Sequence, residues 1–138
     1  MAGILVDTNV IIDAADPAGS WYDWSARQLE KAADTEGVCI NPIIYAELAG
    51  YIDSPHLMDE LLADLLLEKA DLPWNAAFAA GRAFVRYRRS GGQKTAPLPD
   101  FYIGAHAQAS GLALLTRDAT RYRSYFPGIR LIAPDCAP

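Results

Sequence analysis

The stretch that most constrains the fold is residues 3–10, GILVDTNV, in which an apolar run ends on a carboxylate, a hydroxyl and an amide. The apolar residues 4–6 do not alternate with polar ones, so we expect both faces of this strand to be buried, as in a parallel sheet covered by helices on each side. Strands of such sheets present ligand-binding groups at their carboxyl ends, where Asp7 falls. A second interpretation stays open at this point, in which Asp7 caps the next helix and Thr8 and Asn9 form an ordinary turn.

Apolar runs that predict strands alternate with amphipathic segments that predict helices along the whole chain. Because strands that alternate with helices are typical of a parallel sheet with right-handed crossovers, the sequence predicts an α/β fold. At 138 residues, we expect a single domain, residues 1–138. The predicted strands are 4–6, 38–40, 112–115 and 129–132, with a brief edge strand at 71–73, and the predicted helices are 10–14, 20–35, 43–52, 55–70, 75–89, 100–110 and 120–126.

Composition excludes several classes of protein. No apolar run approaches the roughly 18–20 residues of a membrane-spanning helix, and no basic region precedes an apolar one at the N-terminus, so we expect no membrane association and no signal peptide. Cys39 and Cys136 form no metal-binding or disulfide pattern. We therefore expect a cytoplasmic protein.

Four acidic residues stand where a carboxylate is unusual: Asp7, Glu47, Asp100 and Asp118. Glu47 lies within or beside the apolar stripe of its helix, and burying it is costly unless it is paired or bound to a cation. Asp100 begins a helix, where simple capping would also explain it, and Asp118 follows a buried strand. If the four converge, their mutual repulsion favours a divalent cation, and oxygen ligands without a histidine or cysteine cluster suit Mg²⁺ or Mn²⁺ rather than zinc.

The charge of the chain is unevenly distributed. Residues 1–81 carry 14 acidic and 3 basic side chains, whereas residues 82–138 carry 3 acidic and 9 basic ones. Arg82, Arg86 and Arg89 share one helix face, and Lys94 follows a glycine-containing loop. We expect these four residues to contact phosphate groups of a polyanionic partner, with Arg117 closer to the acidic residues, although a basic stretch of this kind is often only a solvated face.

With all four acidic residues placed, the chain resembles the PIN domain family, and within it the VapC toxins of bacterial toxin–antitoxin pairs. The residues that carry the resemblance span nearly the whole chain: Val6-Asp7-Thr8-Asn9-Val10, Glu47, the segment from Leu98 to Ala107, and Leu115-Thr116-Arg117-Asp118. The resemblance implies a three-layer α/β/α sandwich with strand order 3-2-1-4-5, so that the first and fourth strands are neighbours. It also implies a Mg²⁺- or Mn²⁺-dependent endoribonuclease that is a homodimer and is inhibited by a VapB-like antitoxin.

Carried over to this chain, the resemblance assigns catalysis and metal binding to Asp7, Glu47, Asp100 and Asp118. Thr8, Asn9 and Thr116 would be polar groups that support the metal site. The RNA substrate would be bound by the basic residues Arg82, Arg86, Arg89, Lys94 and Arg117. One departure concerns a further acid that many members carry two to four residues after the last aspartate. Thr120, Arg121 and Tyr122 occupy those positions here, which predicts that a second metal is held weakly or is supplied only with substrate.

Other functions need residues that this chain lacks or has replaced. A haloacid-dehalogenase-type phosphatase needs a second aspartate at position 9, which is asparagine, and a dinucleotide-binding domain needs a glycine-rich turn after the first strand. A phospho-acceptor receiver domain needs a late lysine, and no lysine follows Lys94. Two alternatives stay open within the family: a catalytically weak RNA-binding or regulatory domain, and a nuclease of RNA processing rather than a toxin.

Overall fold

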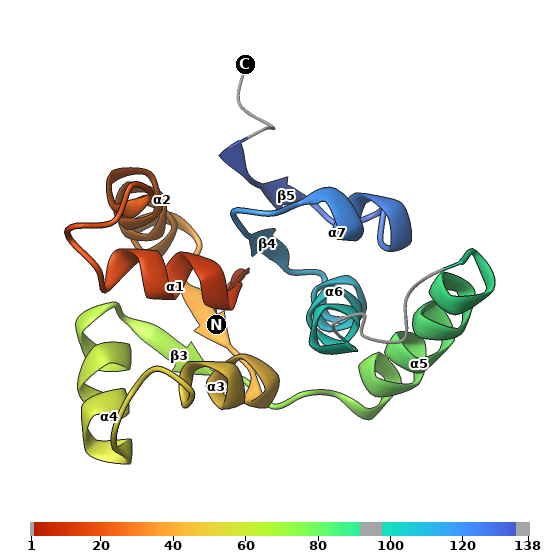
Figure 1. Ribbon diagram of the computed structural model, residues 1–138, viewed down its shortest axis with the longest axis horizontal. Coiled ribbons are helices and arrows are strands. Elements are labelled where there is room, and N and C mark those ends of the chain that lie inside the picture. Colours follow the sequence, from red (N-terminus) through yellow and green to blue (C-terminus); the bar gives the residue numbers. More distant parts are fainter. Residues whose placement is uncertain (1, 92–97, 135–138) are drawn as a thin grey trace.

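The computed structural model describes residues 2–91 and 98–134, and no helix in these two ranges is long and apolar enough to cross a membrane. The described residues form five strands and seven helices (Figure 1). In chain order they are β1 (Ile4–Val6), α1 (Thr8–Ala14), α2 (Tyr22–Thr35), β2 (Val38–Ile40), α3 (Pro42–Leu48), α4 (Pro55–Asp64), β3 (Leu67–Lys69), α5 (Trp74–Arg89), α6 (Leu98–Ser110), β4 (Ala113–Leu115), α7 (Thr120–Tyr125) and β5 (Leu131–Ile132).

The five strands form one parallel sheet in the order β3-β2-β1-β4-β5. This order confirms the predicted α/β class and the neighbouring positions of the first and fourth strands. Val6 pairs with Leu115 at the carboxyl ends of β1 and β4, so the residues that follow these two strands emerge side by side. The register of one strand pair therefore decides which polar residues meet at this edge of the sheet.

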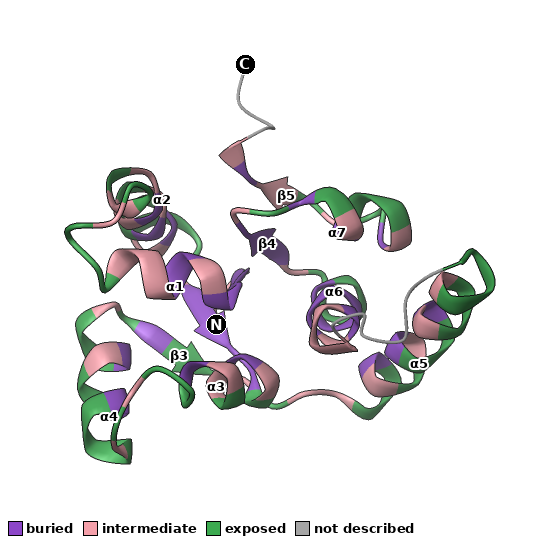
Figure 2. Cartoon of the chain, viewed as in Figure 1, coloured by how far each residue is buried: buried purple, intermediate pink, exposed green. Residues whose placement is uncertain are grey.

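Helices cover the two faces of the sheet. Figure 1 shows α1 and α2 on one side of the sheet and α5 and α6 on the other. All residues of β1, β2 and β4 are buried, as expected for strands that are apolar throughout, and the middle of α6, residues 103–107, is buried as well (Figure 2). The core is therefore one layer of strands packed on both sides, with its carboxyl edge left for polar residues.

The third strand lies elsewhere than the sequence predicts. Ser54 caps α4 as expected, with its Oγ accepting a hydrogen bond from the amide of Leu57 at 3.2 Å, but the helix ends at Asp64 rather than near residue 70. Leu66 adopts a left-handed φ of 61°, and the chain then enters β3 at residues 67–69, beside β2, rather than at 71–73. The leucine pattern predicts a longer helix, but pairing with an open sheet edge outweighs that local preference.

Close packing between the middle of α6 and the residue after α7 positions α6. A Cβ atom added to Gly104 would lie 2.6 Å from Cε2 of Phe126, so only glycine lets the two segments approach this closely. The rings of Phe101, Tyr125 and Tyr87 pack edge to face or tilted in the same region, with centroids 5.4 to 5.8 Å apart. The N-terminal turn of α6 is thereby held against α7.

Candidate active site

Asp7 occupies the junction between the two central strands. Its amide donates to the carbonyl of Leu115 at 2.8 Å, extending the β1–β4 ladder by one residue. Its carboxylate accepts three hydrogen bonds: at Oδ1 from the amide of Thr8 at 2.8 Å, and at Oδ2 from the hydroxyls of Thr116 at 2.8 Å and Tyr122 at 3.0 Å. The capping interpretation of Asp7 is thus correct as local structure, but capping accounts for one of the three bonds.

The electrostatics of Asp7 are unusual for an aspartate. Burial raises the pKa of this carboxyl from 3.8 to about 6; the Thr116 hydroxyl opposes the rise, and the negative charge of Asp100 adds to it. Burial and the nearby Asp7 charge also raise the pKa of the Tyr122 hydroxyl well above its usual range, so Tyr122 stays a hydrogen-bond donor. Near neutral pH the fold therefore holds a carboxylate that a cation would stabilise.

Glu47 reaches the same region from α3. Its Oε1 accepts a hydrogen bond of 2.6 Å from the hydroxyl of Thr8, the residue next to Asp7. The start of α3 is fixed by Asn41, whose side-chain oxygen accepts from the amide of Ile44 at 3.0 Å and whose side-chain nitrogen lies 3.0 Å from Nδ1 of His106. His106 is therefore a buried structural partner of Asn41, outside the group of acids.

Asp100 and Asp118 complete the group from the other side. Asp100 lies in the first turn of α6, and burial raises the pKa of its carboxyl, with the Arg121 guanidinium opposing the rise. Nη1 of Arg121 lies 2.6 Å from Oδ2 of Asp100. Asp118 is exposed in the turn after β4, where its amide donates to the Thr116 hydroxyl at 3.1 Å. The Thr116 hydroxyl thus connects Asp7 with the turn that carries Asp118.

A single cavity of about 200 Å³ joins these residues. Its described lining contains all four predicted acids together with two of the three predicted supporting residues: Asp7, Thr8, Asn9, Ile12, Glu47, Tyr51, Asp100, Asp118 and Tyr122. The third, Thr116, lies directly behind as the hydrogen-bond partner of Asp7. Residues more than 100 positions apart in the chain therefore share one acidic cavity at the carboxyl edge of the sheet.

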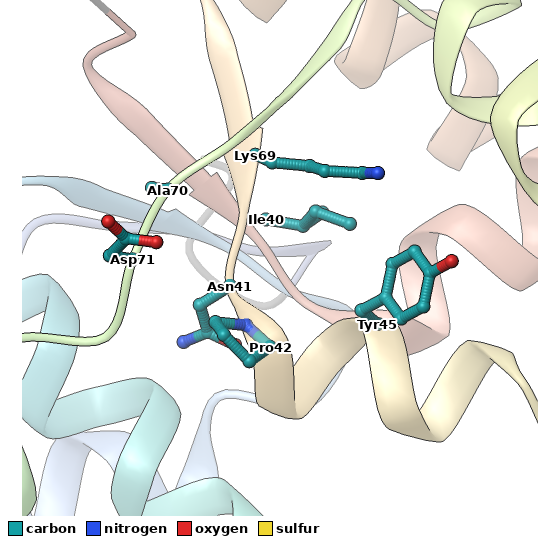
Figure 3. A pocket seen from close by; sticks show the side chains of 7 residues that line it. All are labelled: Ile40, Asn41, Pro42, Tyr45, Lys69, Ala70 and Asp71. Atoms are coloured by element: carbon teal, nitrogen blue, oxygen red, sulfur yellow. The ribbon is translucent and has the colours of Figure 1, made fainter.

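A second cavity, of about 280 Å³, lies at the carboxyl ends of β2 and β3 (Figure 3). Figure 3 shows the Lys69 side chain and the Tyr45 ring on one side of this cavity and Asp71 on the other. The Lys69 ammonium lies 5.2 Å from the centre of the Tyr45 ring. With one carboxylate and one cation, this cavity lacks the concentration of negative charge that distinguishes the acidic cavity.

The acidic cavity fits a hydrated Mg²⁺ or Mn²⁺ ion. None of the described residues that line it is histidine or cysteine, so its ligands are oxygen atoms, which these ions prefer. Across residues 2–91 and 98–134, no three acidic, histidine or cysteine side chains form a ready metal site. Mg²⁺ normally keeps several of its waters and takes one or two carboxylates directly, so the residues present suit a partly hydrated ion rather than a fully coordinated one.

The basic residues predicted to bind RNA fall into three groups. Arg82, Arg86 and Arg89 are exposed on α5. The Arg117 guanidinium contacts Asp13 at 2.8 and 3.2 Å and lies 5.4 Å from the centre of the Trp21 ring, while its amide donates to Oδ1 of Asn9 at 3.1 Å. Lys94 lies outside the described residues. RNA binding by these residues stays a prediction.

Sequence reasoning did not assign a role to two residues that contact the predicted acids. Arg121 and Tyr122 follow one another on α7 and contact Asp100 and Asp7, respectively. Both residues stand where many members of the resembled family carry a further acid. This departure was the feature of the sequence that could have pointed to them. Neither contact was readable from the sequence, because the first depends on how α7 packs against α6 and the second on how α7 lies beside the end of β1.

The chain is similar to known proteins in sequence and in fold. The family model described as "PIN domain" matches residues 4–126. No curated protein sequence matches significantly. VapBC2 from Rickettsia felis bound to a DNA fragment from its promoter matches with a TM-score of 0.71 at 21% identity, covering 94% of this chain and 97% of that one.

Two further solved structures have the same fold. DNA-bound VapBC from Salmonella typhimurium matches with a TM-score of 0.69 at 24% identity, covering 96% of this chain and 98% of that one. Mycobacterium tuberculosis VapC20, described as a sarcin-ricin loop cleaving toxin, matches with a TM-score of 0.66 at 14% identity, covering 92% of this chain and 98% of that one.

Proposed function

The chain belongs to the PIN domain family, and from this premise we propose that it is a metal-dependent endoribonuclease that acts as the toxin of a toxin–antitoxin pair. The observation that carries the proposal is the single cavity lined by Asp7, Glu47, Asp100 and Asp118. VapC20, a toxin that cleaves the sarcin-ricin loop, has the same fold and supports an RNA substrate. We further propose that the chain works as one PIN domain, residues 1–138, in the cytoplasm.

The four acids would hold Mg²⁺ or Mn²⁺ together with its waters. Bound there, the ion supplies positive charge for the phosphate and lowers the pKa of a water molecule that attacks phosphorus. Hydrolysis by attack of water at phosphorus, with the 3′-oxygen as leaving group, gives a 5′-phosphate and a 3′-hydroxyl. The residues of the chain orient these acidic side chains before the substrate binds.

Three hydroxyl groups orient the acids in this proposal. Thr116 and Tyr122 hold Oδ2 of Asp7 from two directions, and Thr8 holds Oε1 of Glu47. Because Asp7 is buried and its pKa is about 6, the carboxylate is ionised at neutral pH but remains close to protonation. Asn9 has a different role, since its side-chain oxygen fixes the backbone of the turn that leads to Asp118.

The partners in the proposal are RNA, a second copy of the chain and a VapB-like antitoxin. Trp74, Phe78 and Val85 share one face of α5 with exposures of 91%, 73% and 38%, which supports α5 as a surface for the second copy. A groove of about 320 Å³ between α2 and the end of α4 includes Leu29 and Leu65 and supports antitoxin binding there. The mass of the purified chain in solution, with and without its antitoxin, tests whether the chain forms a dimer and whether it binds an antitoxin.

The test of the proposed activity is cleavage of labelled RNA by the purified chain in Mg²⁺, in Mn²⁺ and in EDTA. We expect cleavage that requires metal and falls by orders of magnitude in Asp7→Asn. Asp59→Asn, which removes an exposed carboxylate on α4, is the matched control and should cleave at the parent rate. Asp7→Asn that folds and cleaves at the parent rate would refute the assignment.

Two further outcomes distinguish the alternatives. No cleavage of any RNA under any condition, with metal binding intact, would favour an RNA-binding or regulatory domain. Metal-dependent cleavage that a co-expressed antitoxin does not inhibit would favour a nuclease of RNA processing.

A further inference from the structure

Arg121 brings a positive charge to the acidic cavity. It is the second residue of α7, and its Nη1 atom lies 2.6 Å from Oδ2 of Asp100. Among the ion pairs of the described residues, this is the one that includes an acid lining the cavity, since Arg117 pairs with Asp13 and Lys69 with Asp59. Among the residues that the structure describes, Arg121 therefore supplies one fixed cation to a group of four carboxylates.

The packing around Arg121 restricts where its guanidinium can lie. The guanidinium carbon lies 5.7 Å from the centre of the Tyr87 ring, within the range of a cation–π contact. Tyr87 is in turn held by the rings of Phe84, Phe101 and Tyr125. Arg121 is thus held between an aromatic face and a carboxylate, on an element that also places Tyr122 against Asp7.

The guanidinium also remains accessible. The Arg121 side chain is 31% exposed and that of Asp100 is 26% exposed, so the ion pair lies at the rim of the cavity and not beneath it. A guanidinium has five N–H donors in one plane and can contact a carboxylate and a phosphate at the same time. Contact with Asp100 therefore leaves donors available for a phosphate oxygen at the cavity.

We propose that Arg121 is the built-in second cation of this site: it pairs with Oδ2 of Asp100 and leaves Oδ1 for the divalent ion, limits the site to one such ion, and binds a non-bridging oxygen of the RNA phosphate. The inference rests on the proposed nuclease function. It accounts for a chain that keeps all four acids while placing an arginine in the segment after Asp118. The guanidinium supplies the charge that a second ion would otherwise supply.

The proposal predicts opposite effects of Arg121→Ala on metal and on substrate. Without the guanidinium, Asp100 has no cationic partner and the cavity is more negative, so we expect Mn²⁺ to bind at least about tenfold more tightly. RNA loses a phosphate contact, so we expect weaker RNA binding and slower cleavage even though the metal is held better. An ion pair that only stabilises the fold would change neither the metal affinity nor the RNA affinity of the folded protein.

The experiment uses the full chain and three variants, Arg121→Ala, Arg121→Lys and Arg130→Ala. Arg130 is the matched control, because it pairs with Glu36 at 2.6 Å, and neither residue lines the acidic cavity. Calorimetric titration with Mn²⁺ gives the number of ions per chain and their affinity. Fluorescence anisotropy of a labelled single-stranded RNA in EDTA measures phosphate binding without metal or cleavage, and circular dichroism verifies folding.

We expect one Mn²⁺ per parent chain, tighter Mn²⁺ binding with about tenfold weaker RNA binding in Arg121→Ala, partial recovery of RNA binding in Arg121→Lys, and parent behaviour in Arg130→Ala. Two Mn²⁺ ions per parent chain, or unchanged RNA binding in Arg121→Ala, would overturn the proposal. Faster cleavage by Arg121→Ala would also overturn it, since Arg121 would then only compete with the metal. If the parent cleaves no RNA, the proposed function fails, but the metal and RNA titrations still decide the role of Arg121.

Discussion

Replacing Asp7 by asparagine is expected to stabilise the fold while it removes activity. Asp7 is 5% exposed, and its burial raises the pKa of the carboxyl from 3.8 to about 6. A rise of about two pH units, at about 1.4 kcal/mol for each, corresponds to about 3 kcal/mol by which the ionised carboxylate destabilises the folded state. Asparagine has nearly the same shape, and its one oxygen can accept from the hydroxyls of Thr116 and Tyr122. Its NH2 group then faces the Thr8 amide and cannot accept from it, which offsets about 1 kcal/mol of the gain.

The raised pKa of Asp7 predicts how folding stability changes with pH. The unfolded chain releases the Asp7 proton near pH 3.8 and the folded chain near pH 6, so between these values the folded state binds more protons. The contribution of Asp7 to folding stability therefore falls as the pH rises through this window and is constant above it. The free energy of unfolding of Asp7→Asn should exceed that of the parent by about 1 to 2 kcal/mol at pH 7.5, and this excess should disappear at pH 4.

The measurement is urea unfolding of the parent and the variant from pH 4 to pH 8 in EDTA, followed by circular dichroism. Asp59→Asn removes an exposed carboxylate and should give no comparable pH-dependent difference. Adding Mn²⁺ should stabilise the parent, because the ion binds the folded parent in preference to its unfolded state. The difference in free energy of unfolding between Asp7→Asn and the parent should therefore become smaller. An Asp7→Asn protein that is less stable than the parent at pH 7.5, or a difference that does not change with pH, would refute the reasoning.

Metal-dependent cleavage should decline as the pH falls below about 6, because protons and cations compete for the buried carboxylate after β1; a rate in Mn²⁺ that stays flat down to pH 5 would contradict this. Gly104→Ala should lower the free energy of unfolding by about 1–3 kcal/mol, because the added methyl group meets the Phe126 ring. Gly81→Ala on α5, where the methyl group meets nothing within 4 Å, is its control in urea unfolding and should be neutral or stabilising. Arg86→Glu with Arg89→Glu should weaken RNA binding and flatten its dependence on salt, and an unchanged salt slope in anisotropy titrations would leave this face of α5 without a role in RNA binding.

The sequence predicted much of this fold because its strands are short, apolar throughout and separated by clear helix signals. Runs such as residues 4–6 and 113–115 are typical of a strand that is buried on both faces, and the alternation with helices favours parallel pairing. The resemblance to PIN domains then supplied the strand order. The prediction of the third strand was wrong because the leucine spacing of residues 57–66 is helical. The pairing of β3 with β2 is a tertiary interaction, which this local spacing does not encode.

The candidate site was likewise predictable in part from the sequence. The sequence by itself determined which carboxylates follow strands or begin helices, because those positions depend on local pattern. Only the tertiary structure decided their partners: Thr116 and Tyr122 on Asp7, Thr8 on Glu47, and Arg121 on Asp100. These contacts join residues 21 to 115 positions apart. They depend on strand register and on the close approach of α6 to α7, and the free energy that fixes both comes from burying the core, not from the polar residues themselves.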